Sequence, residues 1–197
     1  MGGFLANVPS IKATGFQSAA DDIAKLVKAG RLTQAELERR LPAPDLTFLG
    51  KQLAASSWVP METYIRVLEI LIEKESTGAV EDYLRERGRR AAARLHKLGI
   101  YGQFNASVHT YGERVGTVTS SMSAVLYNFS KWSFESLGPF EFQLTVEEAE
   151  AYPDYLRYVA EGFTEYLGEN LPGGQKLAIT SERVSRDRIV FKGRPRG

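Results

Sequence analysis

The chain has 197 residues and a mass of 21.9 kDa, which is enough for one sizeable hydrophobic core. Its formal net charge of +1 gives no overall attraction to nucleic acid or to an anionic membrane. The absence of cysteine excludes disulfide bonds and thiolate chemistry.

No targeting or membrane segment is apparent in the sequence. No apolar run approaches the ~20 residues that a membrane-spanning helix requires. The N-terminus lacks the basic region and apolar core of a secretory signal. We therefore expect a cytoplasmic protein.

The first 129 residues have mainly helical spacing. Ser18 is a candidate N-cap of a first helix, and Gly30 would end that helix. The run Thr33-Gln-Ala-Glu36 has the pattern of a capping box, which predicts the start of a second helix. A third short helix is expected near residues 46–53, and Pro60 can begin a fourth.

Two further helical segments follow before residue 130. Apolar residues recur at helical spacing from Val80 to Leu98, with Gly99 as the stop. Residues 103–129 keep roughly the same spacing but contain Gly112 and Gly116, so we expect one long helix or two broken ones.

The last third of the chain reads as strand, strand, helix, strand, strand. Large apolar residues alternate with polar ones in residues 131–135 and 140–146, and again in 176–181 and 188–192. A period of two places the apolar side chains on one face of a sheet. Between the two pairs of strands, residues 155–167 form one apolar helical stripe that can cover that face.

These patterns predict an α+β fold in which a helical N-terminal half packs on a small antiparallel ββαββ unit. We expect a helical subdomain over residues 1–129 and a sheet-plus-helix subdomain over residues 130–197, sharing one core.

A family resemblance rests on short motifs spread over residues 15–192. The matching residues are Trp58-Val59-Pro60 with Tyr64 and Leu68, Gly88 with Gly99-Ile100-Tyr101, and Gly162-Phe163 with Leu167, Gly173-Gly174 and the terminal hairpin. Together they resemble bacterial heme–nitric-oxide-binding and vinyl-reductase-like (trafficking-particle-subunit-like) sensor domains. The nearest members belong to an uncharacterised paralogous family expanded in myxobacteria.

The resemblance implies a signalling or partner-binding module that can hold a small hydrophobic ligand between helices and sheet. The candidate pocket residues are apolar or aromatic and are equally suited to a plain core: Trp58, Tyr64, Tyr101, Phe104, Met122, Trp132 and Phe142.

Heme is not expected from the sequence. The heme-binding relatives use an axial histidine and a Tyr-x-Ser-x-Arg run, and this chain has no such run. Its two histidines, His96 and His109, have surroundings that differ from those of the axial histidine. His96 lies near a helix C-terminus, where the helix dipole favours imidazolium, and heme or metal ligation is its alternative role. No Cys, Asp or His lies at metal-ligand spacing from His109, so no metal site is predicted there.

No catalytic set can be assembled from the sequence. Ser120, Ser121 and Ser123 have no nucleophile-elbow motif and no base placed near them. The helical stripe places Glu161 and Glu165 on the solvent side. We therefore predict that the chain is not an enzyme.

Two basic clusters are candidate contacts for an acidic partner or an anion. Arg87, Arg90 and Arg94 recur at helical spacing, and Arg186 and Arg188 lie in the basic C-terminal region. The alternative is that both clusters are simply solvated, and nucleic acid is not the expected partner.

The favoured function is a non-catalytic regulatory module that binds a protein partner or forms a homodimer, for which an edge strand offers free backbone groups. The alternative is a sensor of a small hydrophobic molecule or tetrapyrrole.

Overall fold

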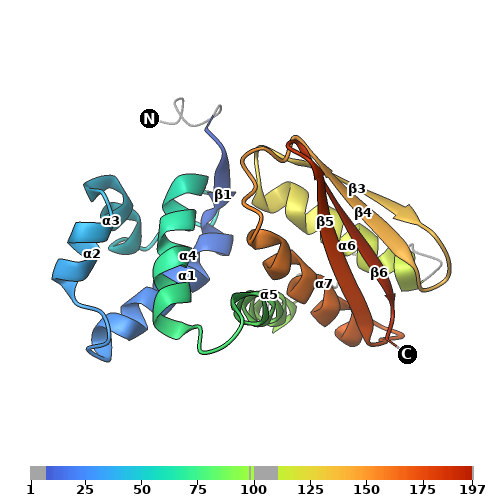
Figure 1. Ribbon diagram of the computed structural model, residues 1–197, viewed down its shortest axis with the longest axis horizontal. Helices are drawn as coiled ribbons and strands as arrows, with labels where there is room; N and C mark the ends of the chain where they lie inside the picture. The colour runs from blue at the N-terminus through green and yellow to red at the C-terminus, as the bar shows by residue number, and fades with distance from the viewer. Residues whose placement is uncertain (1–7, 98, 100–110, 197) are drawn as a thin grey trace. The chain divides into compact units, whose positions relative to one another are not determined.

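The computed structural model describes residues 8–97, 99 and 111–196 (Figure 1). Its elements in chain order are β1 (Ser10–Lys12), α1 (Ala13–Lys28), α2 (Gln34–Arg40), α3 (Ala43–Leu49), β2 (Trp58–Pro60), α4 (Met61–Glu75), α5 (Val80–Lys97), α6 (Tyr111–Leu126), β3 (Lys131–Ser136), β4 (Phe142–Glu147), α7 (Leu156–Asn170), β5 (Leu177–Ser185) and β6 (Arg188–Pro195). Helices and antiparallel sheets are both present, so the predicted α+β class is confirmed.

The chain divides into two compact units. The first comprises Met1–Gly78 with Leu126–Phe129, and the second comprises Ala79–Val125 with Ser130–Gly197. This division differs from a boundary at residue 129, because α5 and nearly all of α6 group with the sheet. None of the helices in the described residues is long and apolar enough to span a bilayer.

In the first unit, α1 and α4 pack on each other beside a short antiparallel pair, β1 and β2. Phe16 of α1 meets Tyr64 of α4 edge-on, with ring centroids 6.3 Å apart. The predicted N-cap at Ser18 is wrong: α1 begins at Ala13, so Ser18 lies inside the helix. The capping box at Thr33 is confirmed, since Thr33 and Glu36 satisfy each other's backbone amides.

The second unit is built on the sheet that the alternating runs predicted. Its four strands lie in the order β3-β4-β6-β5, and all neighbours are antiparallel. Apolar residues of β4, β5 and β6 face one side and are buried: Phe142, Leu144, Val146, Leu177, Ile179, Ile189 and Phe191. Trp132 and Phe134 of β3 are half-buried, and Phe140 of the second predicted run is exposed. Figure 1 shows α6 passing behind the strands of this sheet and α7 beside β5.

Helix α7 begins at Leu156, one residue after the start that its apolar stripe predicts, although the sequence offers an earlier helix-start signal. Thr145 and the glutamates after it follow a capping-box pattern, but Thr145 lies within β4 and pairs with Ser133 and Val190. Glu148 has a positive φ of 56°, which turns the chain out of the sheet. Helix α7 begins only at Leu156, because burial of Val146 in the sheet decides against the local helix signal.

Glycine determines how closely α5 and α7 approach. A Cβ on Gly88 of α5 would lie 1.9 Å from the carbonyl oxygen of Val159, and one on Gly162 of α7 would lie 1.9 Å from the carbonyl oxygen of Arg85. The two helix backbones are therefore in direct contact, which no other residue type permits. As a result α7 is covered by the sheet on one side and by α5 on another.

Replacing Gly88 or Gly162 by alanine should destabilise the second unit by about 3 kcal/mol, since a methyl group there overlaps rigid backbone. Urea unfolding followed by the fluorescence of Trp132, in a Trp58→Phe background, measures this unit. Gly78→Ala is the matched control, because no described atom lies within 4 Å of the added Cβ, and it should change the free energy of unfolding by less than ~0.5 kcal/mol. Equal effects at the three positions would contradict the close crossing.

Tyr111 of α6 ties the end of α7 to the loop that follows. Its hydroxyl donates to the carbonyl oxygen of Gly168 and also lies 3.0 Å from the carbonyl oxygen of Gln175. The Gln175 amide donates back to it over 3.1 Å. Burial raises the pKa of Tyr111 above its ordinary value of 10.0.

Tyr111→Phe should therefore lower the free energy of unfolding by about 1–3 kcal/mol at neutral pH, because the backbone groups of Gly168 and Gln175 lose their hydrogen-bond partner. The neutral phenol is the favoured form in the fold, so its contribution is complete below pH 10 and declines as the pH rises above 10. Urea unfolding at pH 8 and pH 11 should show the difference between the wild type and the variant shrinking at the higher pH. A difference that grows with pH would contradict this assignment.

Candidate functional site

The predicted pocket residues fall in both units. Trp58 and Tyr64 lie in the first unit, where Tyr64 is buried against Phe16. The indole of Trp58 is half-buried and carries the ammonium of Lys12 at 3.8 Å from the ring centroid. This is a cation–π contact, so one face of Trp58 is already in use.

In the second unit, Met122, Trp132 and Phe142 belong to the core between sheet and helices. Trp132 stacks on Phe191 with centroids 5.6 Å apart, and Phe142 meets Phe134 at 6.1 Å. Met122 is buried on α6. Tyr101 and Phe104 lie outside the described residues. The pocket itself stays a prediction.

The basic residues have different environments. Arg87 is only 8% exposed and donates to the hydroxyl of Tyr83 over 3.1 Å, whereas Arg90 and Arg94 are exposed. Arg186 and Arg188 are exposed around the β5–β6 turn. A contact with a partner or anion at these positions stays a prediction.

The prediction that Glu161 and Glu165 face solvent is wrong. They are 2% and 5% exposed, because α7 is packed against both α5 and β5, and residues of both elements reach this side of the helix. Arg85 of α5 donates to Glu161 over 2.8 Å, and Arg196 donates to Glu165 over 2.5 Å. Arg89 lies 3.5 Å from Glu165 and also pairs with Glu169.

These pairs form a charged ladder between α5 and α7 that we call the α5–α7 ladder: Arg85, Arg89, Glu161, Glu165, Glu169 and Arg196. Each buried carboxylate has at least one arginine partner, as buried charges require. Sequence reasoning missed it. The available signal was two arginines and two glutamates at i, i+4 spacing on two helices that each carry a central glycine.

The ladder does not form a catalytic group. The hydroxyl of Ser181 donates to Glu161 over 2.5 Å, and Arg157 donates to that same hydroxyl over 3.0 Å, which holds the serine as a structural link. The described histidine, His96, is exposed and has its Nδ1 3.3 Å from the hydroxyl of Tyr166. Within the described ranges, no three His, Asp or Glu side chains gather to hold a metal.

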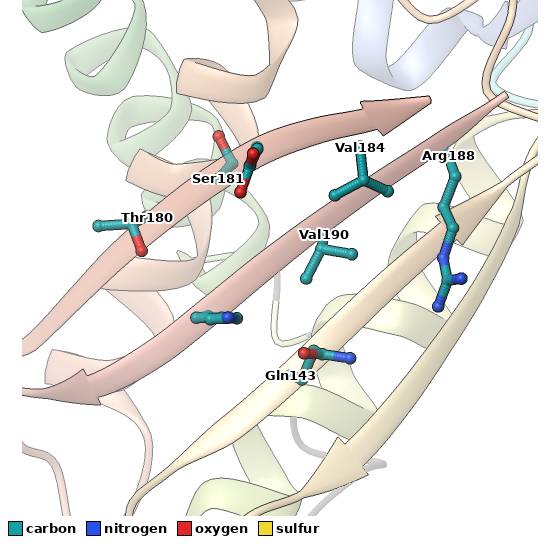
Figure 2. A pocket seen from close by; sticks show the side chains of 8 residues that line it. Gln143, Thr180, Ser181, Val184, Arg188 and Val190 are labelled. Carbon is teal, nitrogen blue, oxygen red and sulfur yellow. The ribbon is translucent and has the colours of Figure 1, made fainter. Parts of the chain in front are cut away.

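The face of the sheet opposite α6 and α7 carries a concavity of about 580 Å³ (Figure 2). We call it the outer groove. It crosses three strands and is lined by Gln143, Thr180, Ser181, Glu182, Val184, Arg188, Val190 and Lys192. Period-two alternation produces it, since these positions, apart from Ser181, alternate with less exposed ones along their strands.

Comparison with solved structures shows the fold. An Fe(II) unliganded H-NOX protein from K. algicida is 10% identical, with a TM-score of 0.63 over 95% of this chain and 97% of that one. A point mutant of T. Tengcongensis H-NOX is 11% identical, with a TM-score of 0.61 over 95% and 98%. An oxygen-binding H-NOX domain related to soluble guanylate cyclases, in its oxygen complex, is 11% identical, with a TM-score of 0.59 over 93% of this chain and 92% of that one.

No protein-family profile and no curated protein sequence matches the chain. The likeness therefore rests on structure, and at this identity it shows the fold alone. It confirms the predicted resemblance to heme–nitric-oxide-binding sensor domains. The matched structures are described as H-NOX domains, and one of them as an oxygen complex.

One prediction must be corrected. The absence of a Tyr-x-Ser-x-Arg run led us to expect no cofactor, and in particular no heme. The structures that share this fold are described by their Fe(II) state, by their heme and by bound oxygen, so that expectation is overturned. A short motif is a poor guide to a ligand when the identity of the matched structures is about 11%.

The contribution of the α5–α7 ladder to stability can be measured by substituting Glu161. Glu161→Ala should destabilise the second unit by about 3 kcal/mol, because Arg85 and Ser181 are left partly buried without this carboxylate. Glu161→Gln keeps an acceptor and should cost less. Glu150→Ala, at an exposed glutamate, is the control and should be nearly neutral. Urea unfolding read from Trp132 measures all three, and a neutral Glu161→Ala would contradict the ladder.

Proposed function

We propose that this chain is a ligand-sensing domain of the H-NOX type and that a tetrapyrrole is the class of ligand it holds. The observation that carries the proposal is the fold, which matches H-NOX structures over 95% of the chain at TM-scores of 0.59 to 0.63. The small-molecule alternative from the sequence is thus better supported than partner binding or self-association.

The described residues alone do not complete a heme site. An axial ligand to heme iron is commonly a neutral imidazole held close to the metal. His96 does not suit this role, since it is exposed and lies against Tyr166. His109 lies outside the described residues and is the other histidine of the chain. We assign the axial role to His109 by this comparison.

One buried group suits an acidic ligand. The Nε of Arg114, near the start of α6, is buried and has no hydrogen-bond partner in the described part of the chain. Its Nη1 donates to the carbonyl oxygen of Pro172 over 2.6 Å, which fixes the guanidinium. A buried donor without a partner is costly, so an acceptor such as a propionate carboxylate would be stabilised there.

Hemin titration tests the proposal. Stoichiometric binding should give a sharp Soret band, and gel filtration should retain the pigment with the protein. His109→Ala should abolish or shift the Soret band. His96→Ala should leave the band unchanged, because the His96 side chain is exposed and lies against Tyr166. Arg114→Ala should weaken binding by up to about tenfold, the loss of one charge-assisted hydrogen bond.

The control is the folded state of each variant, measured by far-ultraviolet circular dichroism. A protein that stays colourless with excess hemin, while remaining folded, would contradict the tetrapyrrole assignment. A band that is lost in His96→Ala and kept in His109→Ala would contradict the choice of histidine.

Partner binding and homodimerisation remain predictions. Strands β3 and β5 are the edges of the sheet, and each offers backbone groups on its outer side. The matched structures support the sensing function and do not test this second one.

A further inference from the structure

The outer groove is not covered by any described element. Val184 on β5 is 49% exposed, and Thr180, Arg188 and Lys192 are exposed as well. Figure 2 shows Gln143, Val190 and Arg188 on the same side of the strands. A concave sheet face with one exposed and one half-buried valine offers both apolar area and depth to a ligand.

Two cations of the groove have no ion-pair partner among the described residues. In that part of the chain Lys192 makes neither an ion pair nor a side-chain hydrogen bond, and Arg188 interacts only through its charge with the neighbouring Asp187. By contrast, Arg183 and Arg196 of the same hairpin are bound to Asp154 and Glu165. The groove therefore presents positive charge that the described fold does not use.

The spacing of these cations determines what fits. Arg188 and Lys192 lie four residues apart on β6, so both point to the same face about 13 Å apart at the usual rise of a strand. One carboxylate or phosphate is too small to contact both. Val190 lies between them on that face, with its side chain half-buried.

Strand register adds hydrogen-bonding groups beside Lys192. Gln143 of β4 and Thr180 of β5 are its direct partners across the sheet, so an amide, an ammonium and a hydroxyl lie in one row. Such a row can bind one carboxylate through several donors. Glu182 lies diagonally across from Lys192 on β5, and it makes the groove unfavourable for a surface of uniform negative charge.

We propose that the outer groove binds an extended acidic segment of a partner protein with the pattern acidic-x-apolar-x-acidic. An extended segment points residues i, i+2 and i+4 to one side with the same rise as β6. Its two carboxylates then meet Arg188 and Lys192, and its apolar residue packs on Val190 and Val184. The segment lies on the face of the sheet and adds no strand to an edge.

A fluorescein-labelled decapeptide with the centre Glu-Thr-Val-Thr-Glu, otherwise Gly and Ser, tests the inference by fluorescence anisotropy with the full chain. Binding should weaken as salt rises. The double variant Arg188→Glu with Lys192→Glu should lose at least about tenfold in affinity. Arg39→Glu with Lys51→Glu, which reverses two exposed cations of the first unit, should bind the peptide as the wild type does.

Peptide variants test the register. A peptide with the centre Glu-Glu-Val-Thr-Thr has the same composition but the wrong spacing of its glutamates, and it should bind several-fold more weakly. A peptide in which serine replaces the valine should also bind several-fold more weakly. Equal binding of the rearranged peptide would overturn the proposal, because it would show attraction by charge alone.

Two other classes of ligand, small anions and anionic membranes, must be excluded as the occupant of the outer groove. Inorganic phosphate that displaces the peptide at equal ionic strength better than sulfate or chloride would show a small-anion site. Binding to phosphatidylserine vesicles that is lost in the Arg188/Lys192 double variant, without peptide binding, would show a membrane surface. Either result overturns the assignment. Hemin loading, read from the Soret band, is independent of it and should be unchanged in the double variant.

Discussion

The contact between the backbones of α5 and α7 at Gly88 and Gly162 is the constraint on which the second unit depends. Each glycine lies where a Cβ would overlap a carbonyl of the facing helix. This contact brings α7 close enough to α5 for Arg85 and Arg89 to reach Glu161 and Glu165, and Ser181 of β5 contacts Glu161 as well. Every other feature of the unit adapts to a helix that is covered on both sides.

The α5–α7 ladder is the direct consequence. Carboxylates that would be solvated on a surface helix become buried, and they pair with arginines from α5 and with Arg196, which directly follows β6. Buried pairs of this kind add little net stability compared with an apolar interface, but they penalise any other register between the helices. The sheet is fixed in turn, since Ser181 and Arg157 link β5 to α7.

The likeness to H-NOX structures and the outer groove are independent features of the molecule. The first is a likeness of the whole fold at 10–11% sequence identity. The second depends on residues that face solvent on a sheet whose other face is filled by its own helices. A ligand in the outer groove would therefore leave the core of the second unit undisturbed.

Local pattern determined the four strands of the larger sheet, most of the helices and the fold class. Alternation in residues 131–146 and 176–192 is decided by which side chains avoid water, and that choice is made residue by residue. The burial of each face of α7 could not be predicted in this way, because an apolar stripe identifies one buried face and leaves the opposite face assigned to solvent. Tertiary packing buried Glu161 and Glu165 through Gly88, a residue in another helix 73 or more positions away. Likewise, Arg188 and Lys192 are ordinary charges in the sequence, and only strand register places Gln143 and Thr180 beside one of them.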